Sequence, residues 1–474
     1  MLESRFDLVE NPSVKYLITL ACIVHLIGCG QSPTAPELGT IYNAAARQSH
    51  VDRNPIIVIP GILGSRLMES KSGQVVWGRF GSGAIDHNSA DGMRSIALPL
   101  SASGWPRDDV QADGVLSELE LAWGFHFRFK AYSQMLAAFG AGGYLDPALA
   151  GRNGIDYGKE HFTCFQFAYD WRRSCAENAA LLGKFIEEKR RYVAKERLRL
   201  YNSTAPVKFD ICAHSMGGLI ARYHLMYGDR PLATDGENPV TWAGARHVEK
   251  LIVVGTPNGG SVYPMHDIIK GFRLSPLVPG FTAASIGTMP SVYELLPPET
   301  DGAIIDEHSR PIPYYDPDEW QRRRWGLMNP AYAADLATLM PDIADPAEHQ
   351  QRARAHLAKL LRNARAFHRA INRDARLPRG LQFHSFAGDA VKTSSRVQVS
   401  ASGEMEMIDW IPGDGSVTRA SVLRDVRKPH QSAQKLRSPI PWTHSYFVFT
   451  DHIAMTADPA FVDNVLHLLL ERPQ

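Results

Sequence analysis

The 474-residue sequence has few cysteines, almost no net charge and no apolar run long enough to cross a bilayer comfortably. Its five cysteines show no metal-ligand spacing, which argues against a structural metal site. The formal net charge of +1 gives no global electrostatic reason to bind nucleic acid. We therefore expect neither a metal ion, nor a cofactor, nor a nucleic-acid partner.

The apolar run Tyr16–Gly28 is followed directly by Cys29. This pattern resembles a bacterial lipoprotein signal, in which the cysteine is acylated on its thiol and becomes the new N-terminus. It predicts a signal peptide over residues 1–28, lipidation of Cys29 and a tether over residues 29–53. Acidic residues before the run, and His25 within it, depart from the pattern. An ordinary secretory signal and a buried helix remain the alternatives.

A lipidated Cys29 would confine the chain, as a monomer, to a membrane surface of a bacterial cell envelope. The residue after it is Gly30 rather than the aspartate that resembles an inner-membrane retention signal. This favours the outer membrane. Without lipidation, the expectation is a periplasmic or secreted protein.

Residues 54–474 alternate short β-type runs with helical patterns, which predicts an α/β fold with a mostly parallel central sheet. Two irregular stretches, 66–160 and 261–380, leave this rhythm and are interpreted as lid and cap insertions. Plain surface elaboration is the alternative. The expected strands are 55–60, 162–169, 207–212, 251–254, 381–387 and 445–449, and the expected helices include 216–227 and 459–470.

A basic amphipathic helix is expected within residues 347–377, where apolar side chains recur at spacings of three and four. Such a helix can lie on anionic lipid. We favour a core-packing helix with a solvated basic face.

Ser215 lies in the run Ala213–Gly217 (AHSMG), between a predicted strand and a predicted helix. A serine flanked by small residues can occupy a sharp strand-to-helix turn, which exposes its hydroxyl to a substrate. The N–H of the next residue, Met216, can then point at a developing oxyanion. Ala213 stands where glycine is more usual, but its small side chain still permits the close crossing. The alternative is that Ser215 only caps the helix.

An activated serine needs a base and an orienting carboxylate, and the α/β-hydrolase fold presents them in the order Ser, acid, His. His452 precedes the terminal helix and fits the base. Asp414, in a glycine-framed turn, and Asp389, directly after a predicted strand, both fit the acid, and local pattern leaves the choice open. The loop after the first strand makes the N–H of Ile62 the second oxyanion donor.

Eight blocks of sequence together resemble the lecithin:cholesterol acyltransferase family, which includes lysosomal phospholipase A2 and plant phospholipid:sterol and diacylglycerol acyltransferases. They occur in family order through most of residues 55–470. The blocks are PIIVIPGILGSRL, VVWG, FAYDWRRS, AHSMGGL, GTPNGG, YELLP, PGDGSV and DHIAM.

The resemblance implies an α/β-hydrolase fold with two large insertions, and it selects Asp414 as the acid because the family's acid lies in a G-D-[DG]-[ST]-V turn. It implies that Trp77 is a lid tryptophan near the acyl chain. It also implies that Asp170 and Arg172 form a buried structural ion pair. The family's lid disulfide has no counterpart, since no cysteine lies between Cys29 and Cys164.

The implied chemistry moves an acyl group from a glycerolipid ester to Ser215, and then to water or to a lipid alcohol. A membrane-anchored enzyme and a lipid substrate would share one surface, which raises their effective concentration. Two alternatives remain: a carboxylesterase for soluble esters, and a non-catalytic lipid-binding envelope lipoprotein.

Overall fold

The structure is a computed structural model, which describes residues 53–471 except 81–82, 117–118, 124, 130–131, 154–159, 238, 274–279 and 428–434. The predicted signal peptide, the predicted lipidation site Cys29 and the predicted tether up to residue 52 lie outside the described residues. Within them, no helix is both long and apolar enough to span a membrane.

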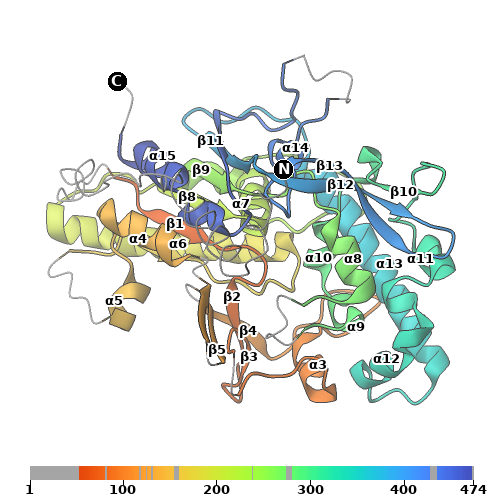
Figure 1. Ribbon diagram of the computed structural model, residues 1–474. Helices are drawn as coiled ribbons and strands as arrows, with labels where there is room; N and C mark the ends of the chain where they lie inside the picture. The colour runs from red at the N-terminus through yellow and green to blue at the C-terminus, as the bar shows by residue number, and fades with distance from the viewer. Residues whose placement is uncertain are drawn as a thin grey trace, which may run out of the picture. The chain divides into compact units, whose positions relative to one another are not determined.

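A six-stranded sheet forms the centre of the described chain (Figure 1), in the order β14-β11-β9-β8-β1-β7, and every pairing in it is parallel. The mostly parallel α/β-hydrolase fold predicted from the sequence is therefore confirmed. The strands are β1 (Ile56–Ile59), β7 (Cys164–Gln166), β8 (Phe209–His214), β9 (Val248–Val254), β11 (Gln382–Gly388) and β14 (His444–Val448).

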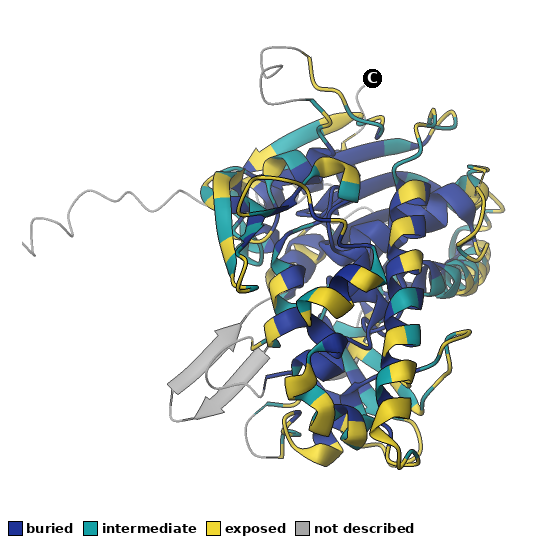
Figure 2. Cartoon of the chain, turned by 90° about the vertical axis from the view of Figure 1, so that its right-hand side faces the viewer, coloured by how far each residue is buried: buried dark blue, intermediate teal, exposed yellow. Residues whose placement is uncertain are grey.

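β1 and β8 are buried along their whole length and β9 along most of it, because helices pack on both faces of the sheet; buried segments are dark blue in Figure 2. The edge strand β14 is partly exposed. Side chains alternate between the faces. Ile57 and Ile59 join one hydrophobic core, with α6 (Cys175–Tyr201), α7 (Met216–Tyr227) and α13 (Pro346–Ile371). Ile56 and Val58 join a second core, with α4 (Ser133–Ala141) and α15 (Pro459–Leu470).

Both predicted helices that flank the site have the expected bounds. α7 ends before Gly228, whose φ of 67° breaks the helix. α15 begins after Asp458, whose carboxylate accepts hydrogen bonds from the first-turn N–H groups of Ala460 and Phe461. The strand expected over 162–169 is shorter than predicted, because β7 pairs only with the four-residue β1.

The chain leaves the central sheet after Ile59 and returns at Cys164. Most of this first insertion lies apart from the sheet, but α4 packs against one face of it. The other elements here are β2 (Ser65–Glu69), β3 (Val75–Trp77), α3 (Ala90–Ile96), β4 (Val110–Val115), β5 (Leu119–Trp123), β6 (Phe125–Phe129) and α5 (Pro147–Asn153).

The second excursion from the sheet runs from the end of β9 to β11 and is largely helical. Its longest helix, α13, buries Leu357, Leu360 and Phe367 completely, so the core-packing interpretation of the basic amphipathic helix is confirmed. The other elements are α8 (Tyr263–Lys270), α9 (Ala283–Ile286), α10 (Pro290–Glu294), β10 (Ile304–Asp306), α11 (Pro317–Arg323) and α12 (Ala333–Leu339). Short 3-10 helices here are η2 (Glu299–Asp301), η3 (Gly326–Met328) and η4 (Pro330–Tyr332); η1 (Ala243–His247) and η6 (Ala454–Ala457) lie elsewhere.

A hairpin that the sequence did not predict follows the central strand β11. Its strands, β12 (Val391–Val399) and β13 (Met405–Gly413), pair antiparallel, and β12 also pairs with β10 of the second insertion. The short helix α14 (Arg419–Leu423) follows. The hairpin leaves the sheet at Gly388 and returns the chain beside it at Asp414.

The first insertion is attached to the core by a buried cation. The guanidinium of Arg172 donates to both carboxylate oxygens of Asp170, at 2.9 and 2.8 Å. It also reaches Asp108 at 2.7 Å and the carbonyl of Ile96 at 3.2 Å, both in the insertion. The implied structural pair is thus present and also anchors the insertion. The three described cysteines, Cys164, Cys175 and Cys212, are free.

Candidate active site

Ser215 occupies the turn between β8 and α7 with φ 52° and ψ −128°, a conformation that costs free energy for a residue with a side chain. The turn brings α7 directly against the end of β1. A Cβ on Gly217 would lie 2.4 Å from the carbonyl oxygen of Pro60, so glycine is required at this crossing. Ser215 therefore sits at the carboxyl end of the sheet, as the sequence motif predicts, rather than simply capping a helix.

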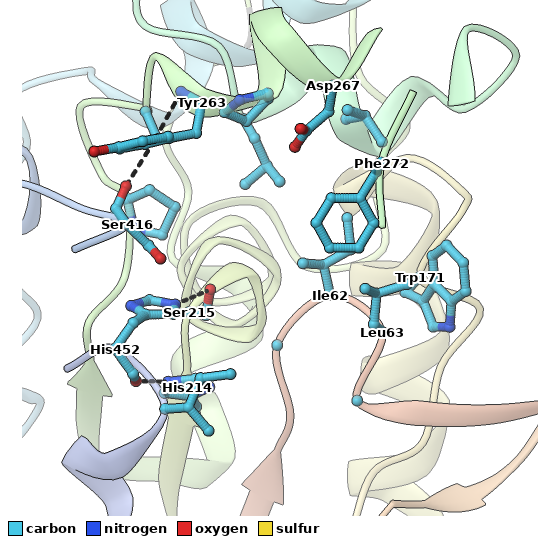
Figure 3. Close-up of a pocket in the computed structure, with 18 of the residues that line it drawn as sticks. Ile62, Leu63, Trp171, His214, Ser215, Tyr263, Asp267, Phe272, Ser416 and His452 are labelled. Atoms are coloured by element: carbon cyan, nitrogen blue, oxygen red, sulfur yellow. Dashed lines mark hydrogen bonds between the residues drawn. The ribbon is translucent and has the colours of Figure 1, made fainter. Parts of the chain in front are cut away.

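Ser215 is the first member of a chain of hydrogen bonds. Its Oγ lies 2.9 Å from Nε2 of His452 (Figure 3), and Nδ1 of the same ring lies 2.8 Å from Oδ2 of Asp414. Because an ionised carboxylate only accepts, Nδ1 carries the proton and Nε2 is left to accept from the serine hydroxyl. This arrangement is able to withdraw a proton from Ser215.

Asp414 is held in place by the turn that follows β13. Its Oδ1 accepts the backbone N–H groups of Ser416 and Val417, at 2.9 and 2.6 Å, and its carbonyl accepts the N–H of His452 at 2.8 Å. Although burial opposes ionisation, His452 and these backbone donors lower the pKa of Asp414 below its ordinary value. The buried carboxylate is therefore charged at neutral pH.

Asp389 does not reach the site. Its carboxylate pairs with the exposed side chain of Arg419, at 2.9 Å, on the outside of the loop. The structure thus brings Asp414, and not Asp389, to His452.

Gly255 gives the imidazole and the carboxylate the room they occupy. It follows the last residue of β9 with φ 58°, and a Cβ there would lie 3.1 Å from the ring of His452 and 3.2 Å from Oδ2 of Asp414. The first glycine of the GTPNGG block therefore leaves room for the side chains of His452 and Asp414.

The two predicted oxyanion donors follow the ends of neighbouring strands, Met216 after β8 and Ile62 after β1. Met216 is the first residue of α7, and the first N–H groups of a helix have no partner within it. Ile62 belongs to the loop after β1 and lines the cavity above the serine (Figure 3). The neighbouring N–H of Gly61 is already occupied, since it donates to the hydroxyl of Tyr132 at 2.8 Å.

An apolar cavity of about 430 Å³ opens above Ser215 and His452. Both insertions build its walls. The lining side chains are mostly aliphatic or aromatic and include Ile62, Leu63, Trp77, Leu116, Trp171, Phe272, Phe281, Ile286, Met289, Val292 and Leu295. A cavity of this size and character suits an apolar ligand.

Trp77 lines this cavity as part of a fixed wall. Its indole N–H donates to the carbonyl of Leu63 at 2.8 Å, and its ring packs against Trp171 and Phe281 at centroid distances of 5.9 and 5.2 Å. Only 2% of the residue is exposed. The hydrogen bond and the aromatic contacts fix the position of the ring.

Three residues of the site were not found from the sequence. Tyr132 accepts a hydrogen bond from the loop after β1, residues 60–64, here called the oxyanion loop. His214 contacts both Tyr132 and the loop after β14, residues 449–453, here called the base loop. Asp267, on α8, projects into the apolar cavity (Figure 3), and burial raises the pKa of its carboxyl. His214 lies within the AHSMG run, but nothing in that run indicates its contacts, and no sequence motif links Tyr132 or Asp267 to Ser215. Nowhere in the described ranges do three His, Cys, Asp or Glu side chains come together in a way that could hold a metal ion.

Known structures with a similar fold include the Tle4–Tli4 complex, matched at 16% identity and a TM-score of 0.54 over 89% of this chain and 100% of that chain. Lipase 1 from Pelosinus fermentans matches at 13% identity and a TM-score of 0.34, over 89% and 100% of the two chains. Mature Bacillus licheniformis lipase BlEst2 matches at 11% identity and a TM-score of 0.33, over 90% and 96%. The first likeness supports the fold alone.

Residues 152–323 match the model of the family described as lecithin:cholesterol acyltransferase. This segment contains the FAYDWRRS, AHSMGGL, GTPNGG and YELLP blocks, so the resemblance seen in the sequence is confirmed there. The search among curated proteins finds no match.

Substitution of Gly255 by alanine tests the close packing below the triad. Both Gly255→Ala and the control Gly302→Ala place a side chain at positive φ, which costs about 1–2 kcal/mol. Only at Gly255 does the added Cβ also meet His452 and Asp414, whereas at Gly302 it meets nothing within 4 Å. We expect Gly255→Ala to lose at least as much thermal stability as the control. The rate at which a fluorophosphonate labels Ser215 should fall about tenfold or more in Gly255→Ala alone. Equal labelling rates would contradict this account.

Proposed function

From the match of residues 152–323 to the lecithin:cholesterol acyltransferase family, we propose that this chain is a serine-dependent lipid-ester hydrolase or O-acyltransferase. The observation that carries the proposal is the unbroken hydrogen-bonded chain from Ser215 through His452 to Asp414, beneath an apolar cavity. No cofactor is required for this chemistry.

In the proposed mechanism, Oγ of Ser215 attacks the ester carbonyl while Nε2 of His452 takes the hydroxyl proton. Asp414 orients the imidazole and stabilises the imidazolium that forms. The N–H groups of Ile62 and Met216 donate to the oxyanion. Collapse of the intermediate releases the alcohol, which takes its proton from His452, and leaves an acyl-enzyme.

The second half-reaction repeats these steps with a different nucleophile. Water or a lipid alcohol gives its proton to His452 and attacks the acyl-enzyme carbonyl. Collapse of this second intermediate breaks the bond to Oγ of Ser215, which takes the proton back from His452 as the acid or the new ester leaves. Water makes the protein a lipase or phospholipase, and a lipid alcohol makes it an acyltransferase.

The cavity favours an acyl chain as the group that enters it. Most of the side chains that line it are aliphatic or aromatic, with Trp77 as one fixed wall. Each buried methylene contributes about 0.8 kcal/mol of favourable transfer free energy. Long-chain esters should therefore bind better than short ones, whereas a general carboxylesterase, the second candidate, would prefer short, soluble esters.

We also propose that Cys29 carries a lipid anchor and that the protein works as a monomer on a membrane of a bacterial cell envelope. The outer membrane is the favoured location. The lipoprotein-like sequence before Cys29 supports this. A lipid substrate and an anchored enzyme would share one surface, so binding would become an encounter at high effective concentration.

Labelled phospholipid, supplied with and without a sterol or long-chain alcohol, tests the proposed reaction. We expect free fatty acid from water, or a new lipid ester when the alcohol is the acceptor, and neither from Ser215→Ala. In parallel, p-nitrophenyl laurate should show a lower KM than the butyrate. Turnover by Ser215→Ala at the wild-type rate would contradict the serine mechanism. A preference for the butyrate would favour the carboxylesterase, and a protein that binds lipid without turnover would favour the non-catalytic lipoprotein.

Replacing each candidate acid tests which carboxylate orients the base. Asp414→Asn places an amide opposite Nδ1 and favours the wrong tautomer of His452, so kcat should fall by about 10³- to 10⁴-fold. Asp389→Asn removes only an exposed ion pair with Arg419 and should change kcat by less than about threefold. Steady-state kinetics on a soluble ester measure both. The opposite ranking would reassign the acid.

Substitution of Cys29 by serine tests the lipid anchor. The thiol is the acylated group in the proposed modification, so Cys29→Ser should move the protein from the membrane fraction to the soluble fraction. Fractionation of cells that express the full chain, followed by immunoblotting, measures this. A variant that stays on the membrane would contradict the lipidation proposal but would have no bearing on the proposed reaction at Ser215.

A further inference from the structure

Tyr132 lies against the site although it belongs to the first insertion. It is the residue before α4, and only 4% of it is exposed. Its hydroxyl lies 2.8 Å from the N–H of Gly61, in the loop of the oxyanion donor Ile62. The same hydroxyl lies 3.0 Å from Nδ1 of His214. One oxygen thus contacts both the oxyanion loop and the residue before Ser215.

The direction of these hydrogen bonds follows from their ends. Nε2 of His214 lies 2.9 Å from the carbonyl oxygen of His452 (Figure 3), and a carbonyl only accepts. Nε2 of His214 therefore carries the proton and Nδ1 accepts. The hydroxyl of Tyr132 must donate to Nδ1, and its oxygen is left to accept the N–H of Gly61.

We propose that Tyr132 and His214 are positioning residues that hold the oxyanion loop and the base loop in register across Ser215. This inference rests on the proposed function. The proposal specifies the direction of three hydrogen bonds. The N–H of Gly61 donates to the Tyr132 oxygen, the O–H of Tyr132 donates to Nδ1 of His214, and the Nε2–H of His214 donates to the carbonyl of His452.

The two loops follow different strands of the sheet, β1 and β14. Ile62 lies three residues beyond the end of β1, and His452 lies four residues beyond the end of β14. The N–H of Gly61 is adjacent in sequence to that of Ile62, so fixing the first restricts the second. At the other end, the main chain of His452 is held twice, by His214 through its carbonyl and by Asp414 through its N–H.

The register matters because oxyanion donors act over a narrow range of distance, about 2.7–3.1 Å from the developing charge. A displacement of about 1 Å can cost about 100-fold in rate. A link that fixes the donor loop relative to the base should therefore appear in kcat rather than in KM, since the oxyanion forms only in the transition state.

His214 suits this role because it stays neutral beside a base that becomes charged. The two imidazole centroids are 4.8 Å apart. The titratable groups near His214 are Tyr132, His452 and Asp414. Burial and the neighbouring His452 lower the pKa of His214 to about 3, and burial raises the pKa of Tyr132. The hydrogen bond from Tyr132 to His214 therefore keeps its direction whether His452 is neutral or protonated.

Removal of one hydroxyl tests the link. Tyr132→Phe keeps the packed ring but deletes both hydrogen bonds, and we expect kcat on a soluble ester to fall about 10- to 100-fold with KM changed by less than about threefold. Tyr144→Phe is the matched control, since Tyr144 is equally buried and its hydroxyl has no hydrogen-bond partner in the described structure. That variant should keep the wild-type kcat.

Substitutions of His214 separate the two ends of the link. The amide of asparagine reaches about the position of Nδ1 and can accept from Tyr132, whereas the amide of glutamine reaches about the position of Nε2 and can donate to His452. Both His214→Asn and His214→Gln should retain more kcat than His214→Ala. Equal kcat in all three variants and the wild type would overturn the inference.

Nitrogen NMR of isotope-labelled histidine gives a readout that does not depend on turnover. We expect His214 to remain in the Nε2–H form, without titrating, between about pH 5 and about pH 9, where an ordinary histidine titrates. A titrating ring, or an Nδ1–H form, would overturn the inference. So would a Tyr132→Phe variant that loses thermal stability but keeps its kcat, since that result indicates a structural role alone.

The failure of this inference and the failure of the proposed function are distinguishable. A wild-type protein that neither turns over lipid esters nor reacts with a fluorophosphonate at Ser215 contradicts the proposed function and, with it, the positioning role. An active wild type with an unaffected Tyr132→Phe variant contradicts the positioning role alone.

Discussion

The strained turn at Ser215 is the constraint on which the site depends. β8 must end and α7 must begin within one residue, so the serine adopts a positive φ and the helix crosses the end of β1 at contact distance. Since the strands of the central sheet are all parallel, the loops after β1, β8, β9 and β14 emerge at this same edge. The loop after β1 supplies the predicted oxyanion donor and the loop after β8 supplies the serine. The loop after β9 leaves room for the imidazole, which the loop after β14 supplies.

The sequence predicted this arrangement well where one short segment determines both the local structure and the role. Ser215 lies between an apolar run and a helical run, and the bounds of α7 follow from them. The acid could not be predicted in this way. Asp389 follows β11 in sequence, whereas Asp414 adjoins it in space, because the β12–β13 hairpin returns the chain to Gly388. A Cβ on Gly388 would lie 2.5 Å from Cβ of Asp414. Only the resemblance to a family separated the two.

Contacts that join distant segments account for what the sequence did not reveal. Tyr132 meets Gly61 across 71 residues and His214 across 82, and nothing in its own neighbourhood in the sequence marks it. The sequence also did not reveal how the first insertion is attached to the core. The motif around Arg172 was visible, but its contacts with Asp108 and Ile96 depend on how the insertion folds back. Residue patterns predict periodic elements, while these interactions depend on tertiary geometry.

The hairpin that carries Asp414 also has a consequence for how such proteins can diversify. Its strand β12 pairs with β10, which belongs to the same insertion that builds much of the cavity wall. The insertion is therefore not a module that could be exchanged between relatives without cost to the chemistry. A transplanted cap would need to bring its own partner for β12, or the acid would lose its support. Recombination should succeed only when cap and hairpin are inherited together.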